Sequence, residues 1–257
     1  MSAAWEQAGL RFEEVGVVGI LTIDRQERLN AIDPGISLAI REAAQHIEAS
    51  ERLRVGVFTG AGERAFCVGA DLKAGGSQVD EIGGWGGFVR FERKKPFIAA
   101  VNGMAVGGGL EIALACDFIY AADHARFGFP EVAIGVAAGA GGMIRFPRIV
   151  GLSRAKEHLL TGQLFDAATA SEMGLINKVV PADRLRESVL SVAEKIGANA
   201  PLSVELSRWV ADTSWGKDDA QSWEISDRAS DILLTSADAD EGRAAFLEKR
   251  PPRWMGR

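Results

Sequence analysis

Three consecutive glycines form the stretch of this sequence with the clearest chemical potential. Gly107, Gly108 and Gly109 stand directly before residues 110–114, whose composition and periodicity predict a helix. Glycine inside a helix costs about 0.8–1 kcal/mol relative to alanine, and this cost is tolerated where something must approach the backbone closely. The first N–H groups of a helix are unpaired and carry the positive end of its dipole. The Gly108 N–H is therefore a candidate donor to a negative oxygen.

Two carboxylates accompany these glycines. Glu111 falls in the first turn of the predicted helix, and Glu131 follows Pro130 further along the chain. A backbone donor and two carboxylates together suit acid/base chemistry at a carbonyl compound. A structural interpretation stays open at this point. The glycines would then serve tight helix–strand packing, and Glu111 would be a first-turn charge that the helix dipole favours.

The composition argues against several other classes of function. The chain has 257 residues, of which 47% are hydrophobic and 25% charged, as in a globular protein. Its net charge of −6 argues against a nucleic-acid partner, and no run approaches the ~18 apolar residues of a membrane helix. Residues 1–11 lack the pattern of a signal peptide, so we expect a cytoplasmic protein without a membrane partner.

Metal, redox and nicotinamide chemistry are also disfavoured. Cys67 and Cys116 form no metal or redox motif and are expected to be buried free thiols, and the three histidines lack ligand spacing. Residues 60–65 superficially match a dinucleotide fingerprint, which requires a helix to begin at its glycines. The chain continues instead into the apolar, glycine-broken residues 66–72. We therefore expect neither a metal site nor a nicotinamide cofactor.

Strand and helix patterns alternate over most of the chain and predict an α/β fold. Residues 73–95 form a glycine-rich polar insertion, which is either a mobile loop over a site or a plain surface loop. The C-terminal part is almost entirely helical, with a break at Pro201. This shift divides the chain into a core of residues 1–195 and a helical region of residues 196–257. The predicted strands are 12–15, 17–23, 55–59, 97–101 and 176–180.

Taken in order and spacing, several motifs together resemble the enoyl-CoA hydratase/isomerase (crotonase) family. The resemblance covers essentially the whole chain, including its ending at residues 246–250. It implies a crotonase-like spiral of repeated ββα units with a C-terminal helical oligomerisation region. It also implies a homo-oligomer, either a trimer or a dimer of trimers. The motifs are Phe66-Cys67-Val68-Gly69-Ala70-Asp71-Leu72, Ala100-Val101-Asn102-Gly103, Gly107-Gly108-Gly109-Leu110-Glu111, Pro130-Glu131 and Gly139-Ala140-Gly141-Gly142.

The resemblance implies an acyl-CoA thioester substrate whose carbonyl oxygen is held by the backbone N–H groups of Ala70 and Gly108. Fixed donors suit an enolate-like state, whose oxygen carries negative charge. It implies no cofactor, because coenzyme A is part of the substrate. Hydratases of the family carry two carboxylates, at positions that match Glu111 and Glu131. In the usual assignment Glu111 acts on the water and Glu131 donates the proton. We therefore expect reversible addition of water to a trans-2-enoyl-CoA.

The resemblance also assigns residues that bind CoA. Two of them, Phe246 and Lys249, belong to the C-terminal helix, which in a trimer can come from a neighbouring subunit. Arg25 and Arg28 lie where the family contacts the nucleotide end, and a solvated cationic loop is their alternative interpretation. The CoA residues implied by the resemblance are Arg25, Arg28, Ala70, Asp71, Leu72, Lys73, Phe246 and Lys249.

Other activities of the same family stay open. Ala137 and Ala138 stand where many hydratases have a bulkier residue and proline, and this departure is expected to widen or loosen the acyl pocket. Residues 251–257 and the glycine-rich insertion are similar to the carnitinyl-CoA dehydratase branch. The alternatives are therefore carnitinyl-CoA dehydratase-like chemistry, enoyl-CoA isomerisation and a non-catalytic acyl-CoA-binding protein. The presence of both Glu111 and Glu131 argues against the non-catalytic alternative.

Overall fold

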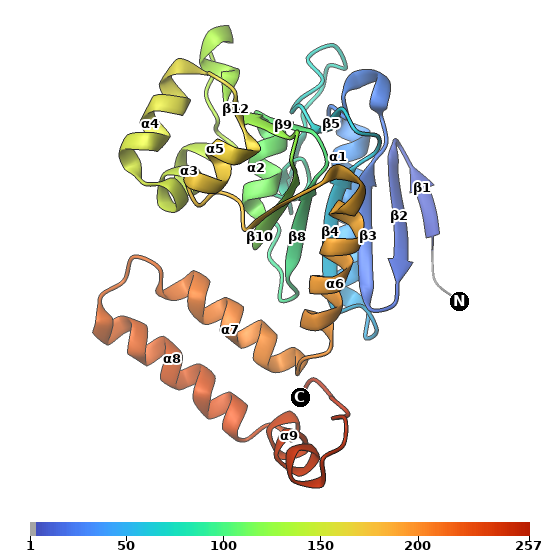
Figure 1. Ribbon diagram of the computed structural model, residues 1–257, viewed down its shortest axis with the longest axis vertical. Coiled ribbons are helices and arrows are strands. Elements are labelled where there is room, and N and C mark those ends of the chain that lie inside the picture. Colours follow the sequence, from blue (N-terminus) through green and yellow to red (C-terminus); the bar gives the residue numbers. More distant parts are fainter. Residues whose placement is uncertain (1–3) are drawn as a thin grey trace.

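A seven-stranded sheet runs through the computed structural model, which describes residues 4–257 (Figure 1). Its strand order is β1-β2-β3-β4-β8-β10-β13. Neighbouring strands are antiparallel from β1 to β3 and parallel from β3 to β13. The parallel strands are apolar runs because helices cover both faces of that part of the sheet. The strands are β1 (Ala4–Gln7), β2 (Leu10–Val15), β3 (Val18–Ile23), β4 (Val55–Gly60), β8 (Phe97–Val101), β10 (Phe118–Ala122) and β13 (Lys178–Val180).

A smaller sheet has the order β12-β11-β9-β5, and a separate hairpin pairs β6 with β7. In two successive segments, β8-β9-α2 and β10-β11-α3, a strand of the large sheet is followed by a strand of the small sheet and then by a helix. These segments are the ββα repeat that the resemblance implied. The strands are β5 (Ala65–Cys67), β6 (Val79–Asp80), β7 (Gly84–Trp85), β9 (Met104–Val106), β11 (Arg126–Gly128) and β12 (Phe165–Asp166).

Helices cover the large sheet on both faces. The sequence predicts a helical stripe of apolar residues, and the structure buries this stripe on α1: Ile36, Ala39, Ile40, Ala43 and Ile47. Asp33 caps this helix by accepting a hydrogen bond of 2.9 Å from Ile36 N. Helix α6 buries Leu185 and Val189 against the opposite face of the sheet. The helices are α1 (Pro34–Ala49), α2 (Gly108–Ala115), α3 (Gly142–Val150), α4 (Leu152–Thr161), α5 (Ala167–Glu172), α6 (Leu185–Gly197), α7 (Pro201–Ser214), α8 (Asp219–Leu234) and α9 (Ala237–Glu248), with 3-10 helices η1 (Gln26–Arg28), η2 (Pro130–Ile134) and η3 (Ala182–Arg184).

The last three helices form a layer of their own below the large sheet in Figure 1. Their described residues bury little apolar surface, with Leu206 of α7, Ala229 of α8 and Ala245 of α9 as the buried hydrophobic positions. Helix α6 ends at Gly197, close to the division expected between residues 195 and 196, which stays a prediction. No helix among residues 4–257 is long and apolar enough to cross a membrane.

The sequence-based prediction of elements was wrong at short strands. Strands β1, β5, β9, β10, β11 and β12 were not predicted, and all of them except β10 have no more than four residues. The insertion at residues 73–95 contains the β6–β7 hairpin rather than only a loop. Strands of two to four residues carry too little periodicity to be recognised alone. Cys67 and Cys116 are buried free thiols as expected, and burial raises the pKa of each to about 12.

Close packing between neighbouring strands generates a stability prediction at Gly56. This residue pairs with Phe97 across β4 and β8, and a Cβ at position 56 would lie 2.3 Å from Phe97 Cδ1. Because Phe97 is fully buried, we expect Gly56→Ala to lower the free energy of unfolding by about 1–3 kcal/mol.

The matched control is Gly242→Ala in α9, where the new Cβ would meet Trp254 at 3.4 Å. Helix propensity predicts unchanged stability or a gain of up to about 1 kcal/mol there. Urea unfolding of both variants measures the two effects, and equal losses would contradict the packing argument.

Candidate active site

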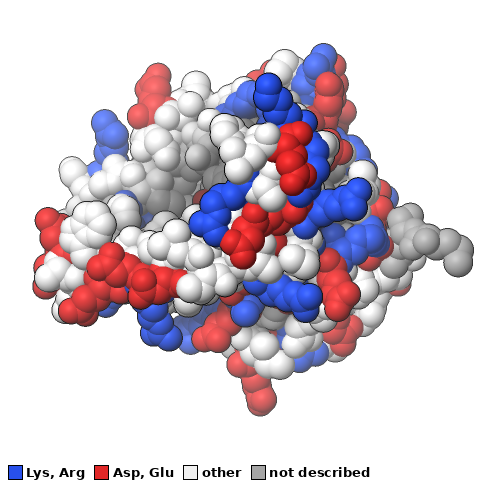
Figure 2. Space-filling view, turned by 90° about the horizontal axis from the view of Figure 1, so that it is seen from below, with Lys and Arg blue, Asp and Glu red and all other residues white. Residues whose placement is uncertain are grey.

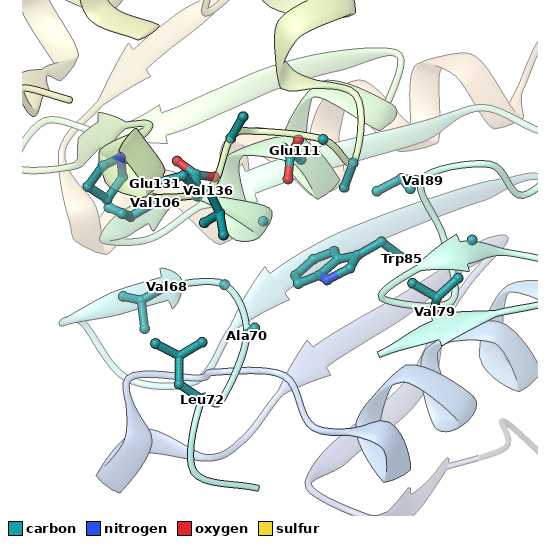
Figure 3. Close-up of a pocket in the computed structure, with 18 of the residues that line it drawn as sticks. Val68, Ala70, Leu72, Val79, Trp85, Val89, Val106, Glu111, Glu131 and Val136 are labelled. Carbon is teal, nitrogen blue, oxygen red and sulfur yellow. The ribbon is translucent and has the colours of Figure 1, made fainter. Parts of the chain in front are cut away.

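A pocket of about 740 Å³ is lined by four segments that lie far apart in the sequence. The segments are the residues after β5, the β6–β7 hairpin, the start of α2, and η2 with the loop that follows it. Ala70, Gly108, Glu111 and Glu131 all line this pocket. Figure 3 shows both glutamates on one side of the pocket and Val68, Ala70 and Leu72 on the other.

Glycine at the start of α2 lets two backbone segments touch. A Cβ on Gly109 would lie 2.0 Å from the Cys67 carbonyl oxygen at the end of β5. Gly69 has φ +92, and a Cβ there would lie 3.1 Å from Gly108 N. Any larger residue at these positions would push the strand end and the helix start apart. The glycines therefore hold the backbone before Ala70 against the N-terminus of α2.

Neither the Ala70 amide nor the Gly108 amide donates a hydrogen bond to another group of residues 4–257. Their neighbours do donate, because Asp71 N reaches Ile32 O at 2.8 Å and Gly107 N reaches Gly128 O at 2.9 Å. Gly108 is the first residue of α2, where an N–H group has no intrahelical acceptor. Both amides therefore remain available to an acceptor in the pocket.

Glu111 is almost completely buried, with 3% of its surface exposed. Its Oε1 accepts a hydrogen bond of 2.9 Å from Gly142 N, at the N-terminus of α3. Burial raises the pKa of Glu111 to about 7, repulsion from Glu131 adds to the increase, and the Gly142 hydrogen bond opposes it. A carboxyl group that titrates near neutral pH is suited to give or take a proton.

Glu131 stands in η2 and its carboxylate lies over the loop before α2. A Cβ on Gly107 would lie 3.2 Å from Glu131 Oε1. The other oxygen, Oε2, is buried and has no hydrogen-bond partner within residues 4–257. Burial also raises the pKa of Glu131. Glu131 therefore lines the pocket with a carboxylate oxygen whose hydrogen-bonding capacity no described residue satisfies.

The predicted CoA residues near Ala70 are only partly free. Arg25 Nη1 contacts Asp71 at 2.8 Å and Asp33 at 3.3 Å. Asp71 Oδ1 accepts a hydrogen bond from Lys73 N, which is the largest cause of the lowered pKa of Asp71. These contacts connect residues 70–73 to the start of α1. Lys73 itself is exposed to solvent.

Leu72 is 79% exposed and lines the pocket, whereas Arg28 lies in η1. Phe246 and Lys249 do not line the pocket of their own chain, and Figure 1 shows α9 at the opposite end of the molecule from β5, β9 and α2. Phe246 is 84% exposed. A single chain thus brings together the predicted oxyanion and carboxylate residues and leaves the two C-terminal residues apart from them.

Sequence reasoning missed Trp85, which projects into the pocket from β7 (Figure 3). The available signal was an aromatic residue between glycines, in an insertion where no other large aromatic precedes Phe88. It also missed the anchoring of Glu111 by Gly142 N, which only the position of α3 reveals. Ala137 lines the pocket and Ala138 is buried at 3% exposure, and a wider or looser acyl pocket at these two positions stays a prediction. No three His, Cys, Asp or Glu side chains of residues 4–257 are grouped to hold a metal ion.

The raised pKa of Glu111 makes a prediction about stability. Folding raises this pKa from 4.5 to about 7, so the proton is bound more tightly in the folded chain than in the unfolded one. The resulting stability is fully present below pH 4.5 and is lost as the pH rises through about 7. We expect Glu111→Gln to stabilise the protein at pH 8 by up to about 3 kcal/mol, with a smaller gain at pH 5.

Thermal unfolding at both pH values measures this difference. The control is Glu6→Gln, the same change at an exposed position of β1. A Glu111→Gln variant that is less stable than the wild type at pH 8 would show that the charged carboxylate is not costly to bury.

Comparison with known proteins identifies relatives that match nearly the whole chain. The family model for enoyl-CoA hydratase/isomerase matches residues 13–257. A carnitinyl-CoA dehydratase of Salmonella arizonae is 40% identical, and the match covers 96% of this chain and 98% of that protein. A probable enoyl-CoA hydratase of Rhizobium meliloti is 36% identical, over 96% of this chain and 98% of that protein.

Solved structures extend the comparison from sequence to fold. The enoyl-CoA hydratase from Mycobacterium tuberculosis H37Rv superposes with a TM-score of 0.93 at 37% identity, covering 97% of this chain and 99% of that chain. The enoyl-CoA hydratase EchA1 from Mycobacterium marinum superposes with a TM-score of 0.92 at 38% identity, with the same coverage of both chains. The chain therefore has the crotonase fold and belongs to the enoyl-CoA hydratase/isomerase family.

Proposed function

We propose that the protein is an enoyl-CoA hydratase, which adds water reversibly to a trans-2-enoyl-CoA thioester. One observation carries this proposal. Two carboxylates with raised pKa, the buried Glu111 and the half-buried Glu131, line the same pocket as two backbone amides that lack an acceptor, those of Ala70 and Gly108. Membership of the family supports an acyl-CoA thioester as the ligand.

In the proposed mechanism the thioester oxygen accepts hydrogen bonds from Ala70 N and Gly108 N. These donors draw electrons toward the oxygen, which makes C3 electrophilic and stabilises the enolate-like state that follows attack. Removal of one donor of this kind costs about 10²–10³ in rate. Preorganised donors are effective here because the pocket walls are mostly apolar side chains.

The two carboxylates handle the protons of the added water. As the water oxygen bonds to C3, Glu111 takes a proton from it, and Glu131 gives a proton to C2, which consumes the electron pair of the enolate. The pKa of each group is raised, and repulsion between the charges contributes at Glu111. Interacting carboxylates of this kind titrate as a pair rather than as two independent groups. One carboxylate can then act as base while the other acts as acid.

The proposal predicts that both glutamates are needed for hydration. Glu111→Gln and Glu131→Gln keep the side-chain size but remove proton transfer, so each should lower crotonyl-CoA hydration by about 10²–10⁴. Because the pair acts as a unit, the double variant should be little slower than the poorer single variant. The measurement is the rate of hydration, with Glu6→Gln on β1 as the control.

Isomerisation of a 3-enoyl-CoA by the same variants separates hydratase from isomerase. A simple isomerase needs one proton shuttle and tolerates loss of the other carboxylate. If either Glu111 or Glu131 proves dispensable for both reactions, the proposal of a hydratase with two catalytic carboxylates is wrong.

Carnitinyl-CoA dehydratase-like chemistry is the second candidate. The observation that favours it is the 40% identity to a carnitinyl-CoA dehydratase over nearly the whole chain. Removal of water from a 3-hydroxyacyl-CoA is the reverse of hydration, so it uses the same amides and carboxylates. Parallel assays with crotonyl-CoA and carnitinyl-CoA distinguish the two candidates by their kcat/KM values.

We also propose that the protein forms a trimer or a dimer of trimers through its C-terminal helices. Large apolar side chains are exposed there, including Trp215 at 62%, Trp223 at 66% and Leu234 at 66%. Figure 2 shows wide uncharged areas around a hollow in the left half of this face, and neither sign of charge dominates the rest. A neighbouring copy that covers these side chains would remove them from water.

Such an arrangement would let Phe246 and Lys249 reach the pocket of another subunit. Lys249→Ala should then raise KM for crotonyl-CoA more than it lowers kcat, because its charge contacts the nucleotide end, remote from the reacting carbons. Steady-state kinetics measures the effect, with Lys217→Ala, between α7 and α8, as the control. Light scattering monitors the assembly state, and an unchanged KM in an intact oligomer would remove Lys249 from the CoA site.

A further inference from the structure

The indole of Trp85 packs edge-on against the first residue of α2. A Cβ built on Gly108 would lie 2.1 Å from Trp85 Cη2, so the ring occupies the space in front of this glycine. Figure 3 shows the indole reaching into the pocket between Glu111 and Ala70. The ring therefore stands beside both the amide proposed to hold the thioester oxygen and the carboxylate proposed to act on C3.

The β6–β7 hairpin holds Trp85 in place through close backbone packing. A Cβ on Gly87 would lie 2.0 Å from the Ser37 carbonyl oxygen of α1, and one on Gly83 would lie 2.0 Å from the Gly87 carbonyl oxygen. The Ser37 hydroxyl donates to Gln78 O at 2.9 Å. These contacts fix the backbone on both sides of Trp85 against α1.

Hydrogen bonds fix the hairpin in two further places. The Asp80 carboxylate accepts from Ile82 N at 2.9 Å and from Gly83 N at 2.8 Å, which closes the turn between β6 and β7. Beyond the hairpin, Arg145 of α3 donates to Val89 O at 2.6 Å. Trp85 is thus anchored from α1, from its own turn and from α3, and it forms a fixed wall of the pocket.

Apolar side chains stand behind this wall. Val79 and Val89 lie on the hairpin side of the indole in Figure 3, and Val89 is 2% exposed. Removal of the indole would therefore extend the pocket into the space lined by the buried Val89 and by Val79, which is 63% exposed. An alkyl chain gains affinity for each methylene group that it buries in such a space.

We propose that Trp85 limits the length of the acyl group that this pocket accepts. The inference rests on the proposed function only for the class of ligand, an acyl-CoA thioester. A carbonyl held at Gly108 N starts the acyl chain within contact distance of the indole, so a short acyl group fits in front of the ring and a longer one collides with it. Trp85 is a specificity-determining residue and takes no part in proton transfer.

The test is binding of saturated acyl-CoA esters, which requires no turnover. Calorimetry gives the Kd of butyryl-CoA and of octanoyl-CoA for the wild type, Trp85→Ala and Trp85→Phe. We expect the wild type to bind butyryl-CoA at least as tightly as octanoyl-CoA. Trp85→Ala should shift the ratio of the two Kd values at least about tenfold toward octanoyl-CoA, because four more methylene groups become buried. Trp85→Phe should give an intermediate ratio, and Trp5→Phe on β1 is the control for loss of an indole elsewhere.

Two results would overturn the proposal. One is a wild-type protein that binds octanoyl-CoA more tightly than butyryl-CoA. This measurement needs no variant, so it decides the question even if Trp85→Ala fails to fold. The other is a folded Trp85→Ala variant whose ratio changes by less than tenfold. Binding without hydration of any enoyl-CoA would refute the proposed reaction but leave the length limit intact. No binding of either ester would refute both.

Discussion

Contact between two backbones at the start of α2 is the constraint on which the site depends. The helix can lie against the end of β5 only because Gly109 and Gly69 present no side chain to Cys67 O and Gly108 N. This approach creates the pocket wall that contains the Ala70 and Gly108 amides, and it sets where Glu111 leaves the helix one turn later. Three glycines at a helix start are locally unfavourable, and the extensive core around them offsets that cost.

The carboxylates illustrate how the fold sustains a costly site. Burial penalises the charged form of Glu111, and the backbone of Gly142 and Ala140 together with the charge of Arg145 compensate this penalty in part. Glu131 has even less support, because its Oε2 has no protein partner among the described residues. Groups with raised pKa inside a pocket destabilise a fold at neutral pH, and their retention is the usual compromise between stability and activity.

Helix α6 and the three helices that follow it differ in how they use apolar surface. Helix α6 covers one face of the large sheet, and its Leu185 and Val189 belong to a buried cluster. Helices α7 to α9 leave large side chains such as Trp223 and Phe246 in water. In our proposal a neighbouring copy covers this surface, and the same contact supplies CoA-binding residues. Stability and substrate binding would then both depend on assembly.

By itself, the sequence determined the α/β class, five of the seven strands of the large sheet and the buried stripe of α1, because periodic segments carry their burial pattern in residue order. Its motifs, read together, also indicated the family that the comparisons established. The tertiary structure alone decided which residues meet. Nothing in residue order shows that Gly142 N reaches Glu111, that Arg25 is paired with Asp71, or that Trp85 stands before Gly108. Each of these contacts joins segments that are distant in the chain, and such contacts depend on packing geometry rather than on local propensity.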